Sequence, residues 1–177
     1  MVEQLAFKFW RNQLVARSNR AGPIMPNECI FCRIVEGKIP CHKIYEDDKH
    51  LAFLDIHPNT KGMTLVITKK HFDSYVFDMS NEDYHELIEV TKKIAKGLDK
   101  ALRVKRTAMV MEGMGVNHAH IKLYPLHGIK KKFEKILAKK IKFFDHYEGY
   151  VATFIGPRAK DEELKKLALK IRSVLNV

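Results

Sequence analysis

The clearest pattern along the chain is a strict alternation of polar and apolar residues over positions 116–123. A period of two is typical of a half-buried β-strand, whose neighbouring side chains point to opposite faces of the sheet. The side chains of His118, His120 and Lys122 then share one face, while the residues between them pack into the core. We interpret this face as a site for phosphate or metal, although a polar, solvated strand face would show the same pattern.

The flanking sequence predicts further strands on both sides of one long helix. Residues 44–56 are interpreted as two strands around an Asp-rich turn, and 63–68 and 107–112 as one strand each. Apolar residues recur at helical spacing over 80–104, where Ser80 followed by acidic residues is typical of a helix N-cap. Strands arranged around such a helix predict an α+β domain.

A helix–strand–helix extension is expected after residue 128. The pattern predicts a lysine-rich helix over about 131–143, a strand over 150–155 and a terminal helix over 162–174. The terminal helix is expected to make its apolar contacts through Leu164, Leu167, Leu169, Ile171 and Leu175.

Composition narrows the class of protein. The 177 residues are 46% hydrophobic and 30% charged, which is ordinary for one globular domain. No apolar run approaches the roughly 20 residues that cross a bilayer. Three cysteines, two of them in a Cys-x-x-Cys pair, do not resemble a secreted disulfide framework. We therefore expect a soluble cytoplasmic protein with no membrane span.

The net charge of +11 is the one unusual global property. Residues 129–177 hold thirteen Lys and Arg against six Asp and Glu, so this part alone carries +7. Such an excess favours anionic partners such as nucleotides, nucleic acid or an acidic membrane surface. A merely solvated lysine-rich surface is the preferred interpretation, because no basic motif interleaved with aromatic residues is visible. Residues 1–25 are also basic, and we interpret them as an amphipathic or targeting segment or as an extension before a start at Met25.

The Cys-x-x-Cys pair, Cys29 and Cys32, is either redox-active or half of a zinc site. Zinc requires two further ligands, and the histidines expected on rigid elements are His71 and His118. Two cysteines and two histidines form a closed tetrahedral set that suits structural Zn²⁺. A buried cysteine pair without metal is the alternative.

The segment 113–123 resembles the signature of the histidine triad (HIT) family, His-x-His-x-His followed by two apolar residues. Lys122 stands where the family usually has its third histidine. The resemblance covers roughly residues 28–128 and implies a HIT-like antiparallel sheet crossed by one long helix, in a homodimer. The expected domains are a basic extension over 1–25, a HIT core over 26–128 and a basic extension over 129–177 packed on that core.

The resemblance also implies roles for individual residues. Zinc-bearing members place their metal ligands at positions that match Cys29, Cys32, His71 and His118. A purine nucleotide would lie against Ile30, Phe31, Phe53 and Ile56, with Asp55 accepting hydrogen bonds from the ribose and Gly113 and Gly115 near the phosphate. From the residues alone, core packing is the preferred interpretation of Phe53 and Ile56, and a turn at the strand end is the alternative for Asp55. Many relatives have a longer loop here, with Asn before it and Gln-Ser within it. This chain has Met111 in place of the Asn and lacks the Gln-Ser pair, so the phosphate loop is abridged.

The expected chemistry follows from His120, because His118 is assigned to zinc. A neutral imidazole, whose unperturbed pKa is about 6.5, can attack the α-phosphorus and form a nucleotidyl-histidine. Lys122 can offset phosphate charge but is a poor general acid at its ordinary pKa, and His127 could donate the proton instead.

We therefore predict a HIT-type hydrolase or transferase that cleaves the α-phosphate bond of purine nucleotide conjugates, either phosphoramidates or dinucleoside polyphosphates. Two alternatives remain open: a catalytically weak nucleotide-binding protein, and an enzyme that removes 5′-adenylate from nucleic acid.

Overall fold

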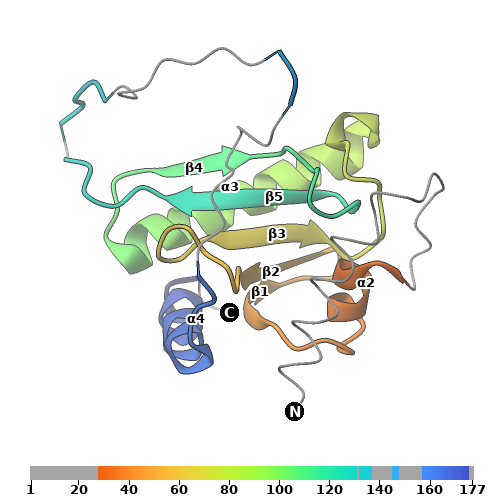
Figure 1. Ribbon diagram of the computed structural model, residues 1–177, viewed down its shortest axis with the longest axis horizontal. Coiled ribbons are helices and arrows are strands. Elements are labelled where there is room, and N and C mark those ends of the chain that lie inside the picture. The colour runs from red at the N-terminus through yellow and green to blue at the C-terminus, as the bar shows by residue number, and fades with distance from the viewer. Residues whose placement is uncertain (1–27, 131, 137–144, 148–156, 176–177) are drawn as a thin grey trace.

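The strands form one five-stranded antiparallel sheet in the order β1-β2-β3-β5-β4 (Figure 1). This computed structural model describes residues 28–130, 132–136, 145–147 and 157–175. The strands are β1 (His42–Glu46), β2 (His50–Leu54), β3 (Thr64–Thr68), β4 (Thr107–Val110) and β5 (His120–Pro125). The helices are α2 (Ile30–Val35), the 3₁₀ helix η3 (Val76–Asp78), α3 (Asn81–Leu102) and α4 (Asp161–Leu175). The predicted α+β fold with one long helix against an antiparallel sheet is confirmed.

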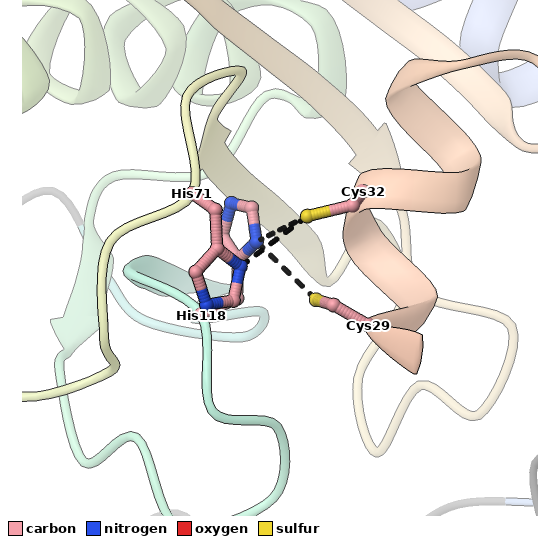
Figure 2. Close-up of side chains that lie close together, drawn as sticks. All are labelled: Cys29, Cys32, His71 and His118. Carbon is pink, nitrogen blue, oxygen red and sulfur yellow. Dashed lines mark hydrogen bonds between the residues drawn. The ribbon is translucent and has the colours of Figure 1, made fainter. Parts of the chain in front are cut away.

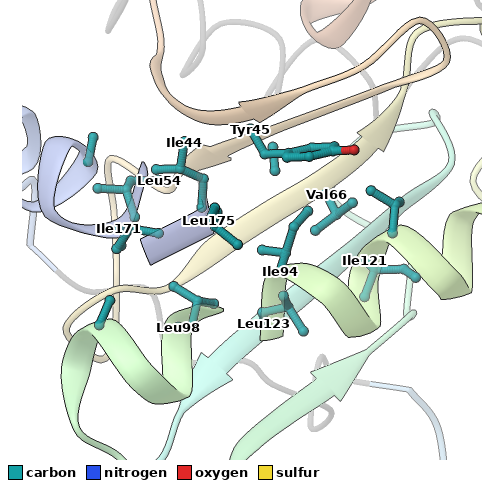
Figure 3. Close-up of a cluster of buried hydrophobic side chains, with 14 of the residues drawn as sticks. Ile44, Tyr45, Leu54, Val66, Ile94, Leu98, Ile121, Leu123, Ile171 and Leu175 are labelled. Atoms are coloured by element: carbon teal, nitrogen blue, oxygen red, sulfur yellow. The ribbon is translucent and has the colours of Figure 1, made fainter. Parts of the chain in front are cut away.

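Two apolar clusters cover the two faces of the sheet. On one face α3 and α4 pack against alternate strand residues, among them Ile44, Leu54, Val66, Ile121 and Leu123 (Figure 3). On the other face α2 packs against Leu51, Phe53, Leu65 and Ile67. The strand period of two explains the division, because residues that alternate along β2 and β3 enter different clusters. In the same register His120 pairs with Ile67 and Lys122 with Leu65, which places both on the α2 face.

The local signals around the long helix are confirmed in detail. The Ser80 side chain accepts a hydrogen bond from the Asp83 backbone N–H at 3.1 Å, so Ser80 caps α3 as predicted. Helix α3 ends at Leu102, and the C-cap residue Arg103 has a φ of 55°, in the left-handed region that closes many helices. The expected strands over 44–56 and 63–68 are also present as β1, β2 and β3.

The strand predicted over 116–123 begins later than expected, at His120. The backbone bends before it, because the His118 N–H donates to the Val116 carbonyl at 2.9 Å. The next residue is tied to another segment, since the Ala119 N–H donates to the Phe72 carbonyl at 2.8 Å. Ala119 nonetheless lies in the α3-side core, so the predicted alternation of faces holds. The strand expected over 107–112 likewise ends early, at Val110.

The described part of the C-terminal extension packs α4 on the core. Its buried residues are Leu164, Ala168, Ile171 and Leu175, which recur at helical spacing and form one stripe. The contact expected from Leu169 is wrong, because Leu169 lies beside that stripe and is 67% exposed. The helix predicted over 131–143 is also wrong where it can be compared, since residues 132–136 are not helical. The rest of that range, the strand predicted over 150–155 and residues 1–27 lie outside the described residues.

Candidate functional site

Four predicted metal ligands converge from three separate segments to form a compact group, which we call the metal cluster (Figure 2). Cys29 is the N-cap of α2 and Cys32 lies within that helix, His71 follows β3, and His118 precedes β5. One ligand atom from each of the four residues lies within 4.8 Å of the others. Sγ of Cys32 is 3.3 Å from Nδ1 of His71 and 3.6 Å from Nδ1 of His118. Sγ of Cys29 is 3.4 Å from the same His118 nitrogen.

The three sulfur–nitrogen separations fit a tetrahedral zinc ion. With Zn–S bonds of about 2.3 Å and Zn–N bonds of about 2.0 Å, neighbouring ligand atoms lie roughly 3.3–3.8 Å apart. The ring of His118 is oriented for this role, since its Nε2–H donates to the Thr68 carbonyl at 2.8 Å and turns Nδ1 toward the cysteines. Burial, followed by the neighbouring Cys29, raises the pKa of Cys32 to about 12, so a thiolate at this position requires a cation beside it.

His120 lies two residues further along the chain and is held differently. Its Nδ1–H donates to the His118 carbonyl at 2.6 Å, which leaves Nε2 as the nitrogen with the lone pair. Burial lowers the pKa of His120 to about 4, so the imidazole is neutral at pH 7. Within the described residues Nε2 has no hydrogen-bond partner. A neutral, oriented imidazole of this kind can act as a nucleophile.

Lys122 continues the same face and forms a partly buried ion pair. Its Nζ lies 3.4 Å from Oε2 of Glu112, and the two side chains are only 19% and 13% exposed. The other carboxylate oxygen of Glu112 accepts a hydrogen bond from the Tyr147 hydroxyl. The sequence pattern does not single out Glu112, but the pairing of Val110 with Lys122 between β4 and β5 brings residue 112 close to this lysine.

A pocket of about 750 Å³ opens in front of His120 and Lys122. All but one of the residues predicted to contact the nucleotide line it: Ile30, Phe31, Phe53, Asp55, Ile56 and Gly115. The aromatic rings of Phe31 and Phe53 meet edge to face, with centroids 5.9 Å apart. Asp55 accepts a hydrogen bond from the His57 N–H at 2.7 Å, and burial raises the pKa of its carboxyl group.

Two of the predicted residues lie elsewhere. Gly113 does not line the pocket but faces Ser74, whose carbonyl oxygen would be 2.8 Å from an added Cβ. With a φ of +73° and no room for a side chain, Gly113 is explained by close backbone approach rather than by phosphate contact. The Nε2–H of the exposed His127 donates to the Lys61 carbonyl at 2.9 Å, and His127 does not line the pocket. It is therefore not placed as a proton donor.

The pocket also has lining residues that sequence patterns do not indicate. They come from the segment just before α4 and from the side of α4 that adjoins its buried stripe: Arg158, Asp161, Lys165, Ala168, Leu169 and Arg172. Their spacing along the helix is visible in the sequence, but their position beside the pocket depends on how α4 packs on the sheet.

Comparison with known proteins identifies the family. The HIT domain matches residues 36–129, more than half of the chain, and the chain belongs to the HIT family. An uncharacterised HIT-like protein of Methanocaldococcus jannaschii is 38% identical over 101 residues, covering 55% of this chain and 78% of that protein. An adenosine 5′-monophosphoramidase of Schizosaccharomyces pombe is 37% identical over 98 residues, covering 55% and 73%. The family therefore includes nucleotide hydrolases.

A solved structure extends the likeness to most of the chain. A zinc-bound histidine triad family protein from Mycobacterium smegmatis superimposes with a TM-score of 0.62 at 25% identity, covering 86% of this chain and 96% of that one. The fold class is thus that of the HIT proteins. Among the described helices, none has both the length and the apolar character to cross a membrane.

Proposed function

We propose that this chain is a nucleotidyl hydrolase or transferase that cleaves the α-phosphate bond of purine nucleotide conjugates. The observation that carries the proposal is His120, a buried neutral imidazole whose Nδ1–H is held by the His118 carbonyl and which lines a pocket large enough for a nucleotide. The likeness to the S. pombe adenosine 5′-monophosphoramidase supports an adenosine phosphoramidate as one substrate class, and dinucleoside polyphosphates are the other.

In the proposed reaction the base lies between the apolar walls of the pocket, and Asp55 accepts hydrogen bonds from the ribose. Nε2 of His120 attacks the α-phosphorus, a P–N bond forms, and the leaving group departs with the electrons of its bond to phosphorus. Water then attacks the same phosphorus, the P–N bond breaks, and the nucleoside monophosphate is released. The imidazole is cationic while the P–N bond exists, and its hydrogen bond to the His118 carbonyl stabilises that charge.

Lys122 is proposed to offset the charge that develops on the phosphate oxygens. Its ammonium group is held in the pocket wall by Glu112 at 3.4 Å, and an ion-paired ammonium group is a weak general acid. Leaving groups that need little protonation should therefore react faster than basic amines.

We further propose that the metal cluster binds one structural zinc through Cys29, Cys32, His71 and His118. A zinc ion held by this closed ligand set would neutralise the thiolates. It would also join α2 to the segment after β3 and to the segment before β5. The adjoining α2 residue Phe31 contacts the rings of both His118 and His120, with centroid distances of 5.7 and 5.3 Å. The cluster would in this way position the pocket wall without taking part in the chemistry.

The test uses chromatography to measure the release of AMP from three substrates: an adenosine phosphoramidate, a diadenosine polyphosphate and an adenylated DNA end. His120→Ala should lower turnover of the best substrate by at least about 10³-fold, while AMP still binds. His127→Ala is the matched control, because His127 is exposed and lies outside the pocket. Unchanged turnover in His120→Ala would refute the nucleotidyl-histidine route.

A nucleotide-binding protein with weak catalysis is the second candidate. The Glu112–Lys122 ion pair favours this candidate, because the pair occupies the position where an active enzyme would be expected to have a proton donor. AMP binding without release from any of the substrates would support this candidate. Release from the adenylated DNA end alone would instead support removal of 5′-adenylate from nucleic acid.

A further inference from the structure

Helix α4 forms a second wall of the pocket, outside the segment matched by the HIT domain. The helix is held in place by its buried residues Leu164 and Ile171, which pack into the same core as α3. The adjoining side of the helix presents Ala168, which also belongs to that core, and the exposed Leu169 to the pocket. The pocket therefore extends beyond the residues that the family resemblance assigns to the nucleotide.

The start of α4 is joined to the segment that is proposed to hold the ribose. The Ala159 N–H donates to the Ile56 carbonyl at 3.0 Å, and Ile56 directly follows Asp55. Asp161 joins the same end of α4 to β1, since its carboxylate accepts a hydrogen bond from His42 at 2.8 Å. The second wall therefore begins on the ribose side of the pocket.

Not all of the basic side chains that line the pocket have an acidic partner. The pocket is lined by five Lys and Arg residues, and three are ion-paired: Lys43 with Glu46, Lys122 with Glu112, and Arg158 with Asp161. Lys165 and Arg172 have no ion pair within the described part of the chain. They are seven residues apart, or about 10 Å along the axis, so both project from one side of the helix. Their long side chains can converge on one anion above Ala168 and Leu169.

We infer that α4 supplies a second anion subsite, which takes a phosphate carried by the ribose of the bound nucleotide. The inference rests on the proposed function and narrows its substrate class to 5′-nucleotide conjugates with a further phosphate on the 2′ or 3′ hydroxyl. A phosphate on one hydroxyl leaves the other free to donate a hydrogen bond to Asp55. Lys165 and Arg172 supply the positive charge that this phosphate requires.

The experiment is calorimetric binding of AMP, adenosine 3′,5′-bisphosphate and adenosine 2′,5′-bisphosphate. The wild-type protein should bind one bisphosphate roughly tenfold more tightly than AMP, and added salt should reduce the difference. The double variant Lys165→Gln, Arg172→Gln should bind that bisphosphate and AMP with equal affinity. Which isomer binds more tightly identifies the hydroxyl.

The matched control is the double variant Lys166→Gln, Lys170→Gln. These lysines are exposed on the same helix and do not line the pocket, so the control removes the same charge elsewhere. The inference is overturned if neither bisphosphate binds more tightly than AMP, if the preference survives in the Lys165, Arg172 variant, or if the control loses it as well. Wild-type protein that does not bind AMP would instead overturn the proposed nucleotide site itself, so the two failures are distinguishable.

Discussion

The metal cluster and the pocket meet at two histidines that are separated by one residue. His118 is fully buried and belongs to the cluster, while His120 lines the pocket. Both face the α2 side of the sheet, and the ring of Phe31 contacts each of them edge to face. The same residue type on the same face of one segment therefore enters two different environments.

The difference lies in which ring nitrogen a main-chain carbonyl engages. The Thr68 carbonyl accepts from Nε2–H of His118, so Nδ1 points to the cysteines. The His118 carbonyl accepts from Nδ1–H of His120, so Nε2 carries the lone pair. Two carbonyl groups thus select opposite tautomers, which suits one histidine to a metal and the other to attack on phosphorus.

The largest expected effect comes from breaking the metal cluster. Cys32→Ser should lower the zinc content well below one per chain and lower the free energy of unfolding by roughly 5 kcal/mol, because zinc binding contributes directly to folding. Metal analysis and denaturant unfolding measure both quantities. Cys41→Ser is the control, since Cys41 lies outside the cluster. A Cys32→Ser protein that retained one tightly bound zinc would show that the four residues are not the ligands.

An intermediate effect is expected from Lys122→His, which places a titratable proton donor in the pocket wall. Release of AMP from a phosphoramidate of a basic amine should rise about 10- to 100-fold, because general acid catalysis assists a leaving group that must be protonated. Release from an aryl ester with an acidic phenol should change little. The measurement is the rate against leaving-group pKa for both proteins. An equal change for both substrates would mean that Lys122 does not limit protonation.

The smallest effect is expected from pH. The pKa of His120 is lowered to about 4, so its nucleophilic neutral form should persist and kcat/KM should change less than about twofold between pH 8 and 6. An imidazole with its ordinary pKa of about 6.5 would lose most of its neutral form over the same interval. Zinc content measured at each pH separates loss of metal from titration of His120. A midpoint near pH 6.5 would contradict the depressed pKa.

The same histidine also links stability to pH. Its folded-state pKa of about 4 lies below the unfolded value, so the unfolded state binds more protons between pH 6.5 and 4. Its contribution to stability is therefore complete above about pH 6.5 and is lost as the pH falls through this window.

Much of the fold could be predicted because its signals are local. The alternation around His120, the apolar repeat of α3 and the Ser80 cap each depend on neighbours within a few residues. The start of β5 could not be predicted in this way. It depends on the hydrogen bond from Ala119 to Phe72, two residues far apart in the chain.

The candidate site also has features that the sequence predicts and features that depend on tertiary structure. Alternation by itself predicted the shared face of His118, His120 and Lys122, while the four possible metal ligands were predicted from their residue types together with the family resemblance. Only the tertiary structure decided which ring nitrogen of each histidine is held by a carbonyl group, the pairing of Lys122 with Glu112, and the place of α4 beside the pocket. The physical reason is that each of these depends on contacts between distant segments, which form only when the sheet and its helices pack together.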